Sequence, residues 1–375
     1  MNLKNLCVFI MLGALGCRGG GRGIDDITSG GAGGAGGEGG AGGADDAGPD
    51  ADITLTCETP QARFPTCPRP AEGEFPIEIE GWQTETSAMR DIEGNAYVYE
   101  TTDTYGLPDG AQALIGRLSR GGALAAAGLP GEVVRLFTWS ATGDWFDLGT
   151  AESDERGYYR FDLGSAFGTG EHIAYATFPG DGTCGPHGVF LWPRGTQVIL
   201  TDIDGTLTLS DAELTRQIGD PSYVPRENTS SPELVRAWYE KGYKVIYLSA
   251  RPHTLRLPTR AWLELKDLPY GPLITANSLV FGESARVYKR AAIQQLVNEF
   301  GWEIVAAYGN AGSDIQAYED AGHPKDTTFI IGEEAGRSGT VAIPDNDYTQ
   351  HIQTYVNPHP DARQPAGLVQ QPFCR

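Results

Sequence analysis

Apolar strands alternate with amphipathic helices from residue 196 onward, and this alternation constrains the fold more than any other feature of the sequence. The strand expected over 198–201 is continuously apolar, which is typical of a strand buried on both faces of its sheet. Further strands are expected over 244–248, 273–274, 304–308 and 328–331, and helices over 231–241, 254–266, 289–300 and 313–321. Strands that alternate with helices predict an α/β domain over 196–335, built on a doubly wound parallel sheet.

Residues 57–195 follow a different pattern, in which short segments alternate apolar and polar residues between Gly, Asp and Pro turns. These segments lie at 75–80, 95–99, 132–139, 157–162 and 172–178. Period-two alternation rich in Val, Tyr, Phe and Trp predicts antiparallel strands, so we expect an immunoglobulin-like β-sandwich. We expect 148–161 to form a hairpin. His172 and His187 are single histidines among strands, and we expect structural roles for them.

The chain has 375 residues, enough for two ordinary domains with additional tails, and residues 336–375 are expected to form a C-terminal tail. Its 28 basic and 49 acidic residues give a formal net charge of −21. Nucleic-acid binding depends on clustered Lys and Arg, so a nucleic-acid partner is not expected. No protein partner is predicted either.

The N-terminus has the pattern of a bacterial export signal, with one Lys before an apolar run over 6–15 that is too short to span a bilayer. Ala-Leu-Gly-Cys at 14–17 resembles a lipobox, which implies removal of a signal peptide over 1–16 and lipidation of Cys17. An ordinary signal peptide or an uncleaved anchor is the alternative. The Gly- and Ala-rich tract within 17–56 has little to bury and is expected to be a disordered tether. We therefore expect a lipid-anchored protein of a bacterial cell envelope, at the outer membrane.

Cysteine usage agrees with an exported protein. Apart from the signal segment and Cys17, the cysteines are Cys57, Cys67, Cys184 and Cys374. An even number in an oxidising compartment predicts disulfides, and four cysteines permit three pairings. We prefer Cys57 with Cys67 and Cys184 with Cys374, although the sequence alone does not choose. The scattered spacing, without a CxxC motif, argues against zinc.

Polar residues gather where the expected strands end. Asp202 and Asp204 follow the strand 198–201, and their spacing of two lets an extended backbone point both carboxylates the same way. Paired carboxylates can bind Mg²⁺ and divide the roles of nucleophile and proton carrier. A calcium loop is the alternative, because acidic and hydroxyl side chains also fall at EF-hand spacing. Leu207 stands where that loop needs Gly, and a strand rather than a helix precedes it.

Three later segments add further polar side chains. Ser249 follows the strand 244–248, Lys289 opens an expected helix, and Asn310 and Asp314 follow the strand 304–308. Taken singly, these residues have ordinary interpretations as a helix cap, a solvated lysine and a Gly-rich turn. The carboxyl ends of parallel strands meet at one edge of a sheet, so we expect these side chains to lie together.

The order of these signals resembles a known signature. DxDGT, a strand-end Ser, a Lys and GNxxxD occur in this order in phosphatases of the haloacid-dehalogenase-like superfamily. Over about 198–332 the chain is similar to the lipin-type catalytic domain, also found in phosphatidylinositol transfer proteins of the retinal-degeneration-B group. The shared stretches are DIDGTLT (202–208), SD (210–211), GYKVIYLSARP (242–252), GP (271–272), AAYGN (306–310), DIQAY (314–318) and Gly322.

The resemblance implies a role for each matching residue. Asp202 would be the nucleophile that accepts the phosphoryl group, and Asp204 would be the general acid and then the base. Ser249 would hydrogen-bond the phosphoryl oxygens, and Lys289 would offset their charge. The resemblance further implies two substrate-binding residues, Thr206 and Arg251.

The same resemblance implies Mg²⁺ as cofactor and a lipid phosphate such as phosphatidate as substrate. The expected ligands are Asp202, the Asp204 carbonyl, Asn310 and Asp314. The segments after Thr206 and Ser249 are too short for a cap domain, which favours a bulky or membrane-borne substrate. The alternatives are a non-catalytic phosphatidate-binding lipoprotein and a phosphatase of another bulky phosphomonoester. Transfer-protein relatives lose catalysis when the nucleophile or acid is replaced, and both aspartates are intact here.

Overall fold

The computed structural model describes residues 79–85, 87–88, 97–122, 125–139, 145–220 and 223–363. The chain divides into two compact units, Met1–Ile53 and Thr54–Arg375, and all described residues belong to the second. The signal segment, the tether and every cysteine except Cys184 lie outside the described residues, so the predictions made for them stay predictions. Cys184 is disulfide-bonded. Within the described ranges, no helix is long and apolar enough to cross a membrane.

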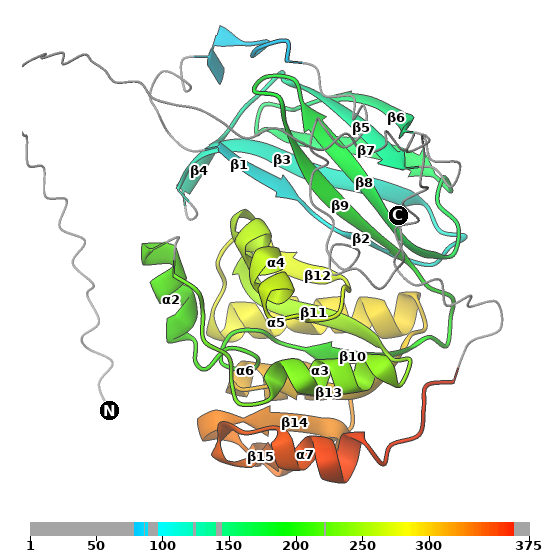
Figure 1. Cartoon of the computed structure of the whole chain (residues 1–375), viewed down its shortest axis with the longest axis vertical. Helices are drawn as coiled ribbons and strands as arrows, with labels where there is room; N and C mark the ends of the chain where they lie inside the picture. The colour runs from blue at the N-terminus through cyan, green and yellow to red at the C-terminus, as the bar shows by residue number, and fades with distance from the viewer. Residues whose placement is uncertain are drawn as a thin grey trace, which may run out of the picture. The chain divides into compact units, whose positions relative to one another are not determined.

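Six parallel strands form one sheet, in the order β12-β11-β10-β13-β14-β15 (Figure 1). They are β10 (Gln197–Thr201), β11 (Lys244–Pro252), β12 (Leu273–Ala276), β13 (Glu303–Gly309), β14 (Thr328–Ile331) and β15 (Val341–Ile343). The chain runs outward from β10 through β11 to β12, and then returns to β13 on the other side of β10. Strand order therefore reverses between β10 and β13, and open α/β sheets bind ligands at such a reversal.

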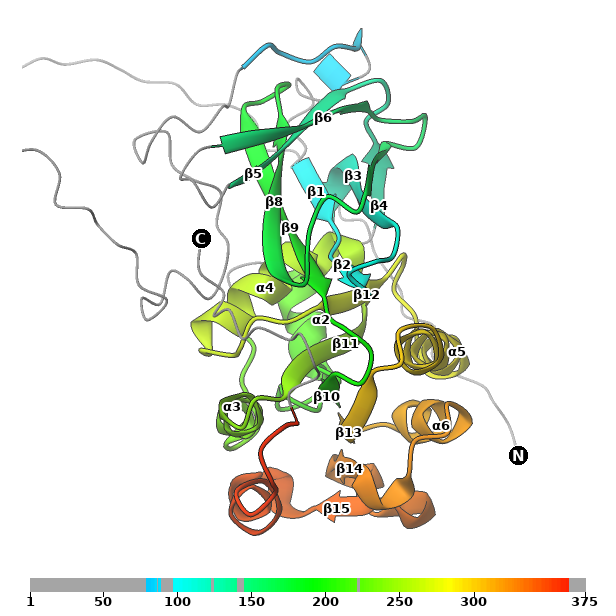
Figure 2. The ribbon, with the colours of Figure 1, turned by 90° about the vertical axis from the view of Figure 1, so that its right-hand side faces the viewer.

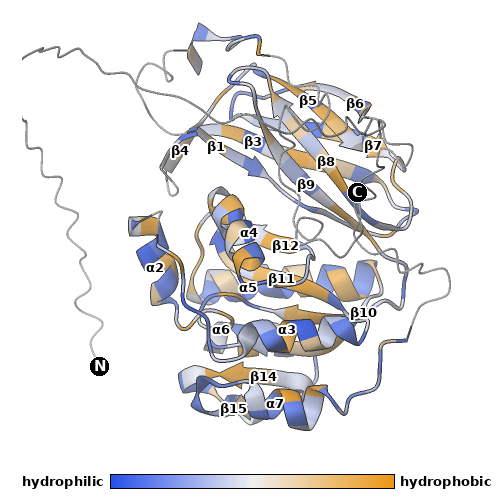
Figure 3. Ribbon diagram, in the orientation of Figure 1, coloured by the Kyte–Doolittle hydropathy of each residue, from blue (hydrophilic) through white to orange (hydrophobic). Residues whose placement is uncertain are grey.

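Helices cover both faces of this sheet (Figure 2). The helices α3 (Ser231–Glu240) and α4 (Arg256–Leu265) lie on one face, and α5 (Gly282–Gln294) and α6 (Gly312–Asp320) lie on the other. Hydrophobic colouring follows the sheet strands, whereas α3 mixes hydrophilic and hydrophobic residues (Figure 3). Val198, Ile199 and Leu200 are fully buried, as a strand covered on both faces requires. The prediction of an α/β fold with a parallel sheet is confirmed.

Some elements differ from the sequence prediction. The helix α5 begins at Gly282 rather than at 289, because Ala285, Lys289 and Ile293, spaced four apart, form a continuous buried face. Lys289 therefore lies inside the helix instead of at its start. The helix α2 (Ala212–Gly219) is an addition to the expected helices, because no helix was expected before 231. The segment expected to be a C-terminal tail contributes β15 and α7 (Thr349–His351).

Two further sheets form the N-terminal part of the described chain. One sheet contains β1 (Tyr97–Thr101), β3 (Gln112–Gly122), β4 (Ala125–Gly128) and β7 (Tyr158–Gly164). The other, in the order β2-β9-β8-β5-β6, contains β2 (Thr104–Gly106), β9 (Thr183–Leu191), β8 (Gly170–Phe178), β5 (Val133–Trp139) and β6 (Trp145–Glu152). All pairs are antiparallel except β2 with β9. Buried residues of both sheets share one core, and the immunoglobulin-like topology stays a prediction.

The expected hairpin over 148–161 is wrong. The strand β6 pairs with β5, whereas β7 pairs with β3 in the other sheet, so the connection crosses between sheets. Asp154 stabilises this crossing, because its carboxylate accepts the backbone N–H groups of Arg156 and Tyr158, each at 2.8 Å. Gly157, at φ 85° and just before β7, approaches the neighbouring strand β3 so closely that a Cβ would lie 2.2 Å from the Leu118 carbonyl oxygen.

A buried aspartate joins the β-sheets to the parallel-sheet domain. Asp103, between β1 and β2, forms ion pairs with Arg256 and Arg260 of α4. Its carboxylate also accepts the backbone N–H groups of Leu273, at 2.8 Å, and Gly188, at 2.9 Å. Leu273 belongs to the edge strand β12, so Asp103 satisfies a backbone donor that an uncovered edge would expose.

Candidate active site

The loop that follows β10 carries both predicted carboxylates in a sharply turned backbone. Gly205 adopts φ 68°, and a Cβ at this position would lie 2.0 Å from Nδ2 of Asn310. Only glycine fits such a position without strain. The turn at Gly205 brings this loop against the residue that follows β13.

Asn228 holds this loop from behind, and sequence reasoning missed it. Its side chain is buried, and its amide donates to the carbonyl oxygens of Gly205, Thr206 and Thr208 at 3.2, 2.8 and 2.9 Å. The hydroxyl of Tyr348 also donates to the Thr206 carbonyl, at 3.2 Å. Buried carbonyls need such partners, so these two side chains fix the loop's backbone.

Lys289 brings together two of the predicted acids. Its ammonium group lies 2.6 Å from Oδ1 of Asp202 and 2.6 Å from Oδ1 of Asp314, and all three side chains are buried. Burial raises the pKa of Asp202; Lys289 opposes this rise, while the Asp314 and Asp204 charges add to it. Burial disfavours the charged form of Lys289, but the Asp202 and Asp314 carboxylates outweigh burial and raise its pKa.

Arg251 lies behind Asp204 and is fully buried. Its Nη2 and Nε atoms contact the two carboxylate oxygens of Asp204 at 2.8 and 2.9 Å, a bidentate pair. Its Nη1 atom donates to Gln217 of α2 at 3.0 Å and to Thr259 of α4 at 2.9 Å. Ser249 lies 3.4 Å from Asp204. These contacts orient Asp204, and the substrate-binding role predicted for Arg251 stays a prediction.

Asn310 is positioned by neighbours on both sides. Oδ2 of Asp314 accepts its backbone N–H at 3.1 Å, and its side-chain amide donates to Asp211 at 3.2 Å. The Asn310 side-chain oxygen therefore faces Thr206. The Thr206 hydroxyl lies 3.3 Å from this oxygen and 3.3 Å from Oδ2 of Asp202. Sequence reasoning did not assign Asp211 to the site, although Ser210-Asp211 was one of the stretches that carried the resemblance.

The site holds more negative than positive charge. The carboxylates of Asp202, Asp204, Asp211 and Asp314 are gathered around two cations, Lys289 and Arg251. Burial raises the pKa of Asp211, and the Asp204 and Asp314 charges add to the rise. With all four carboxylates ionised, the cluster has two negative charges in excess, which a divalent cation would balance.

The donor chemistry fits Mg²⁺. Within the described ranges, no three His, Cys, Asp or Glu side chains are grouped to hold a metal by themselves. Mg²⁺ typically binds through one or two carboxylates and keeps several waters, so it does not require such a group. The Asp202 carboxylate, the Asp204 carbonyl and the Asn310 side-chain oxygen offer the hard oxygen ligands that Mg²⁺ prefers.

A pocket of about 500 Å³ opens at these residues. Asp202, Asp204, Lys289, Asn310 and Asp314 line it together with apolar side chains from α2 and from the segment before α5. The charged lining residues Asp202, Lys289 and Asp314 are buried, whereas Phe281 is 69% exposed. The pocket therefore has a charged floor and an apolar side near its mouth.

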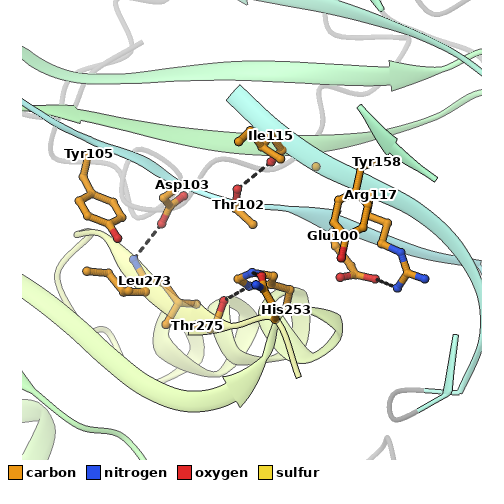
Figure 4. A pocket seen from close by; sticks show the side chains of 13 residues that line it. Glu100, Thr102, Asp103, Tyr105, Ile115, Arg117, Tyr158, His253, Leu273 and Thr275 are labelled. Carbon is orange, nitrogen blue, oxygen red and sulfur yellow. Dashed lines mark hydrogen bonds and ion pairs between the residues drawn. The ribbon is translucent and has the colours of Figure 1, made fainter. Parts of the chain in front are cut away.

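A second pocket, of about 220 Å³, lies where β1 and β3 meet β12 (Figure 4). Its polar side chains are paired with one another: Glu100 with Arg117 at 3.0 Å, and His253 with Thr275 at 2.7 Å. Burial raises the pKa of Glu100 although Arg117 opposes it, and burial lowers the pKa of His253. None of the predicted catalytic or metal-binding residues lines this pocket, so the larger one is the candidate active site.

The comparisons with known proteins agree with this location. The rat Membrane-associated phosphatidylinositol transfer protein 1 is 27% identical over 282 residues, which cover 74% of this chain and 21% of that protein. Protein retinal degeneration B of Drosophila melanogaster is 26% identical over 213 residues, which cover 56% of this chain and 16% of that protein. This chain thus spans about a fifth of the length of the first relative.

One solved structure, that of the Pnkp1/Rnl/Hen1 RNA repair complex, is 20% identical to this chain. The match covers 34% of this chain and 40% of the chain in that structure. Its TM-score of 0.28 is too low to support a conclusion.

Residues 199–332 match the family described as PITM 1-3, LNS2 domain. The resemblance predicted over about 198–332 is therefore confirmed at the level of the domain. The matched segment contains every predicted catalytic and metal-binding residue, and it is similar to the LNS2 domain of these proteins.

Proposed function

We propose that the parallel-sheet domain is a Mg²⁺-dependent phosphatase that acts on phosphatidate or a related lipid phosphate through a phosphorylated Asp202. The observation that carries this proposal is the buried Asp202 carboxylate, 2.6 Å from Lys289 at the floor of the pocket. Asp204 lies two residues further on, so a proton carrier accompanies the nucleophile. The lipid-related part of the proposal is supported by relatives that are named as phosphatidylinositol transfer proteins.

The proposed reaction has two displacements. An oxygen of Asp202 attacks phosphorus, the bond from phosphorus to the ester oxygen breaks, and Asp204 gives its proton to the leaving alcohol. Water then attacks the phosphoryl group on Asp202, and Asp204 takes a proton from that water. Inorganic phosphate leaves, and both aspartates return to their starting states. Lys289 and Ser249 stabilise the phosphoryl oxygens through charge and hydrogen bonding.

Mg²⁺, when bound, would supply positive charge that lets the phosphate dianion approach the carboxylates. The side chains of Asp202 and Asn310 and the Asp204 carbonyl would hold it. Asp314 would support this arrangement, because it accepts the N–H of Asn310 and contacts Lys289. Asp211 would orient Asn310 by accepting its side-chain amide.

The shape of the site supports a bulky, partly apolar substrate. In the described parts of the segments after Thr206 and Ser249, the helices α2, α3 and α4 have eight to ten residues each. They are too short to form a cap domain, so the pocket stays accessible to a large molecule. A phosphate group would meet the charged floor, while a glycerol backbone and the start of an acyl chain would meet the apolar side.

A second candidate function is phosphatidate binding without catalysis. Two observations favour it: the relatives are named as transfer proteins, and Arg251 occupies both oxygens of Asp204 in an ion pair. Such a module would bind the lipid phosphate with the same floor and would release no phosphate. The lipid anchor predicted at Cys17 is compatible with either function, because both need the site near a membrane.

Phosphate release from dispersed phosphatidate at saturating Mg²⁺ separates the two functions. We expect the wild-type chain to release phosphate, chelation to stop the release, and Asp202→Asn to abolish it while leaving the fold intact. Equal rates for wild type and Asp202→Asn would remove Asp202 as nucleophile. If neither releases phosphate from this lipid or from a panel of soluble phosphomonoesters, while the wild type binds phosphatidate, the binding module is correct.

A further inference from the structure

Apolar side chains lie at the mouth of the active-site pocket. We call the segment Leu279–Val280–Phe281, between β12 and α5, the apolar rim. All three residues line the pocket, and Ile218 of α2 lines it as well. Phe281 is 69% exposed, among the highest values for a large hydrophobic side chain in the described part of the chain. Apolar side chains that lie together and partly exposed beside a binding site mark an interaction surface or a ligand-binding groove.

The rim is coupled to the catalytic floor through one helix. Phe281 is the residue that precedes the first turn of α5, and Lys289 lies about two turns further along the same helix. Lys289 in turn contacts Asp202 and Asp314. A surface that contacts the apolar rim would therefore lie at a fixed distance from Asp202, because α5 connects the rim to Lys289.

The pocket is too small for a whole membrane lipid. Its volume of about 500 Å³ lies within the range of roughly 300–1,000 Å³ that suits one drug-sized molecule. A phosphate, a glycerol backbone and the first part of an acyl chain fit such a volume, but two full acyl chains do not. If the substrate is a two-chain lipid phosphate, the rest of both chains must stay in the bilayer while the headgroup reaches Asp202.

We infer that the apolar rim docks onto a lipid bilayer and inserts Phe281 between lipids, so that a headgroup enters the pocket while its chains stay in the membrane. This inference rests on the proposed lipid-phosphate substrate. The rim is uncharged and the chain carries a net charge of −21, so insertion rather than electrostatic attraction drives the docking. Binding should therefore persist at high salt, which weakens electrostatic association.

The test is flotation with phosphatidylcholine vesicles that contain phosphatidate, using the full chain with Cys17→Ser to remove the predicted lipid attachment. In this background we expect Phe281→Ser to weaken vesicle binding about tenfold, which corresponds to about 1.4 kcal/mol. Phe146→Ser is the matched control, because Phe146 is 59% exposed but lies in β6. We expect the control to bind like the parent chain at low and high salt.

Equal binding by the parent chain and Phe281→Ser would overturn the docking inference, as would binding that disappears at high salt. An equal loss with Phe146→Ser would overturn it too, because the effect would not belong to the rim. Flotation needs no turnover, so it is separate from the proposed function. Phosphatase activity without Phe281-dependent binding removes the docking inference alone, and Phe281-dependent binding without any phosphatase activity removes the enzyme alone.

Discussion

Two buried ion clusters in the described part of the chain have opposite compositions. In the active-site cluster, one cation, Lys289, lies between two carboxylates, Asp202 and Asp314. In the cluster that joins the two domains, one carboxylate, Asp103, lies between two cations, Arg256 and Arg260. Both clusters are buried. They differ in the sign of their excess charge and in what surrounds the central ion, Lys289 in one cluster and Asp103 in the other.

The difference explains which cluster can do chemistry. Asp103 accepts two backbone N–H groups besides its two arginine contacts, so its lone pairs are occupied and nothing further can bind to it. The active-site cluster has an excess of negative charge and faces a pocket of about 500 Å³. It is incomplete until a cation and an anionic phosphate join it, whereas the Asp103 cluster is complete and serves stability.

The largest effect on stability should come from Asp103→Ala. This change leaves Arg256 and Arg260 buried without their carboxylate, and breaking a buried ion pair from one side costs about 3–5 kcal/mol. We expect the free energy of unfolding in urea to fall by that amount. Asp202→Ala, in the other cluster, should cost less, because Lys289 keeps Asp314. A larger loss for Asp202→Ala would contradict the contrast between the clusters.

The next largest effect is a loss of phosphatase activity, and it comes from Asp204 in the active-site cluster. Asp204→Asn keeps the shape of the side chain but removes the proton carrier, so phosphate release should slow by at least about 10²-fold, the lower end for general acid–base loss. The thermal unfolding midpoint should fall as well, because the fully buried Arg251 loses its carboxylate partner. Asp103→Asn is the comparison variant, and we expect it to lower the midpoint more than Asp204→Asn does. An Asp204→Asn rate within tenfold of wild type would remove Asp204 from the reaction.

Mg²⁺ should stabilise the folded chain even without substrate. A cation that binds the folded state at 100 times its dissociation constant adds about 2.7 kcal/mol. We expect Mg²⁺ to raise the thermal unfolding midpoint of the wild type, and Asp314→Asn to shift the response to higher Mg²⁺ concentrations. The Asp202→Ala variant should show no rise. A Mg²⁺ response that is unchanged in Asp202→Ala would place the metal elsewhere.

The active-site cluster could be predicted from sequence because its members stand at strand ends. Asp202 and Asp204 follow β10, and Asn310 follows β13, the neighbour of β10 across the reversal of strand order. Local pattern and the geometry of parallel sheets are sufficient to bring these residues together. Asp211 and Asn228 were missed as site residues because they act through tertiary contacts from irregular segments, which have no periodicity to read.

The joining cluster could not be predicted, because Asp103 and α4 are far apart in the chain and belong to different domains. The error over 148–161 has the same origin. Alternation identifies β6 and β7 as strands, but it does not say which partner each will choose, and the two strands belong to different sheets. The sequence predicts that this helix begins at Lys289, whereas in the structure Lys289 belongs to the buried face inside α5.

The smallest expected effect tests Arg251, the cation of the active-site cluster that also contacts α4. Arg251 holds Asp204 with two nitrogen atoms and donates to Thr259 of α4, the helix that also carries Arg256 and Arg260. Arg251→Lys retains the positive charge but loses the planar fork, so Asp204 becomes less precisely oriented. We expect kcat to fall about tenfold, which corresponds to about 1.4 kcal/mol in the barrier, with KM unchanged.

Arg256→Lys is the matched control for this last variant. It makes the same chemical change on α4, but its partner is Asp103, so we expect a lower thermal unfolding midpoint and an unchanged kcat. If Arg251 binds substrate, as the sequence resemblance implied, Arg251→Lys will raise KM instead of lowering kcat. If both arginine variants lower kcat equally, the two clusters are mechanically coupled through α4, and the division between a catalytic cluster and a structural cluster is wrong.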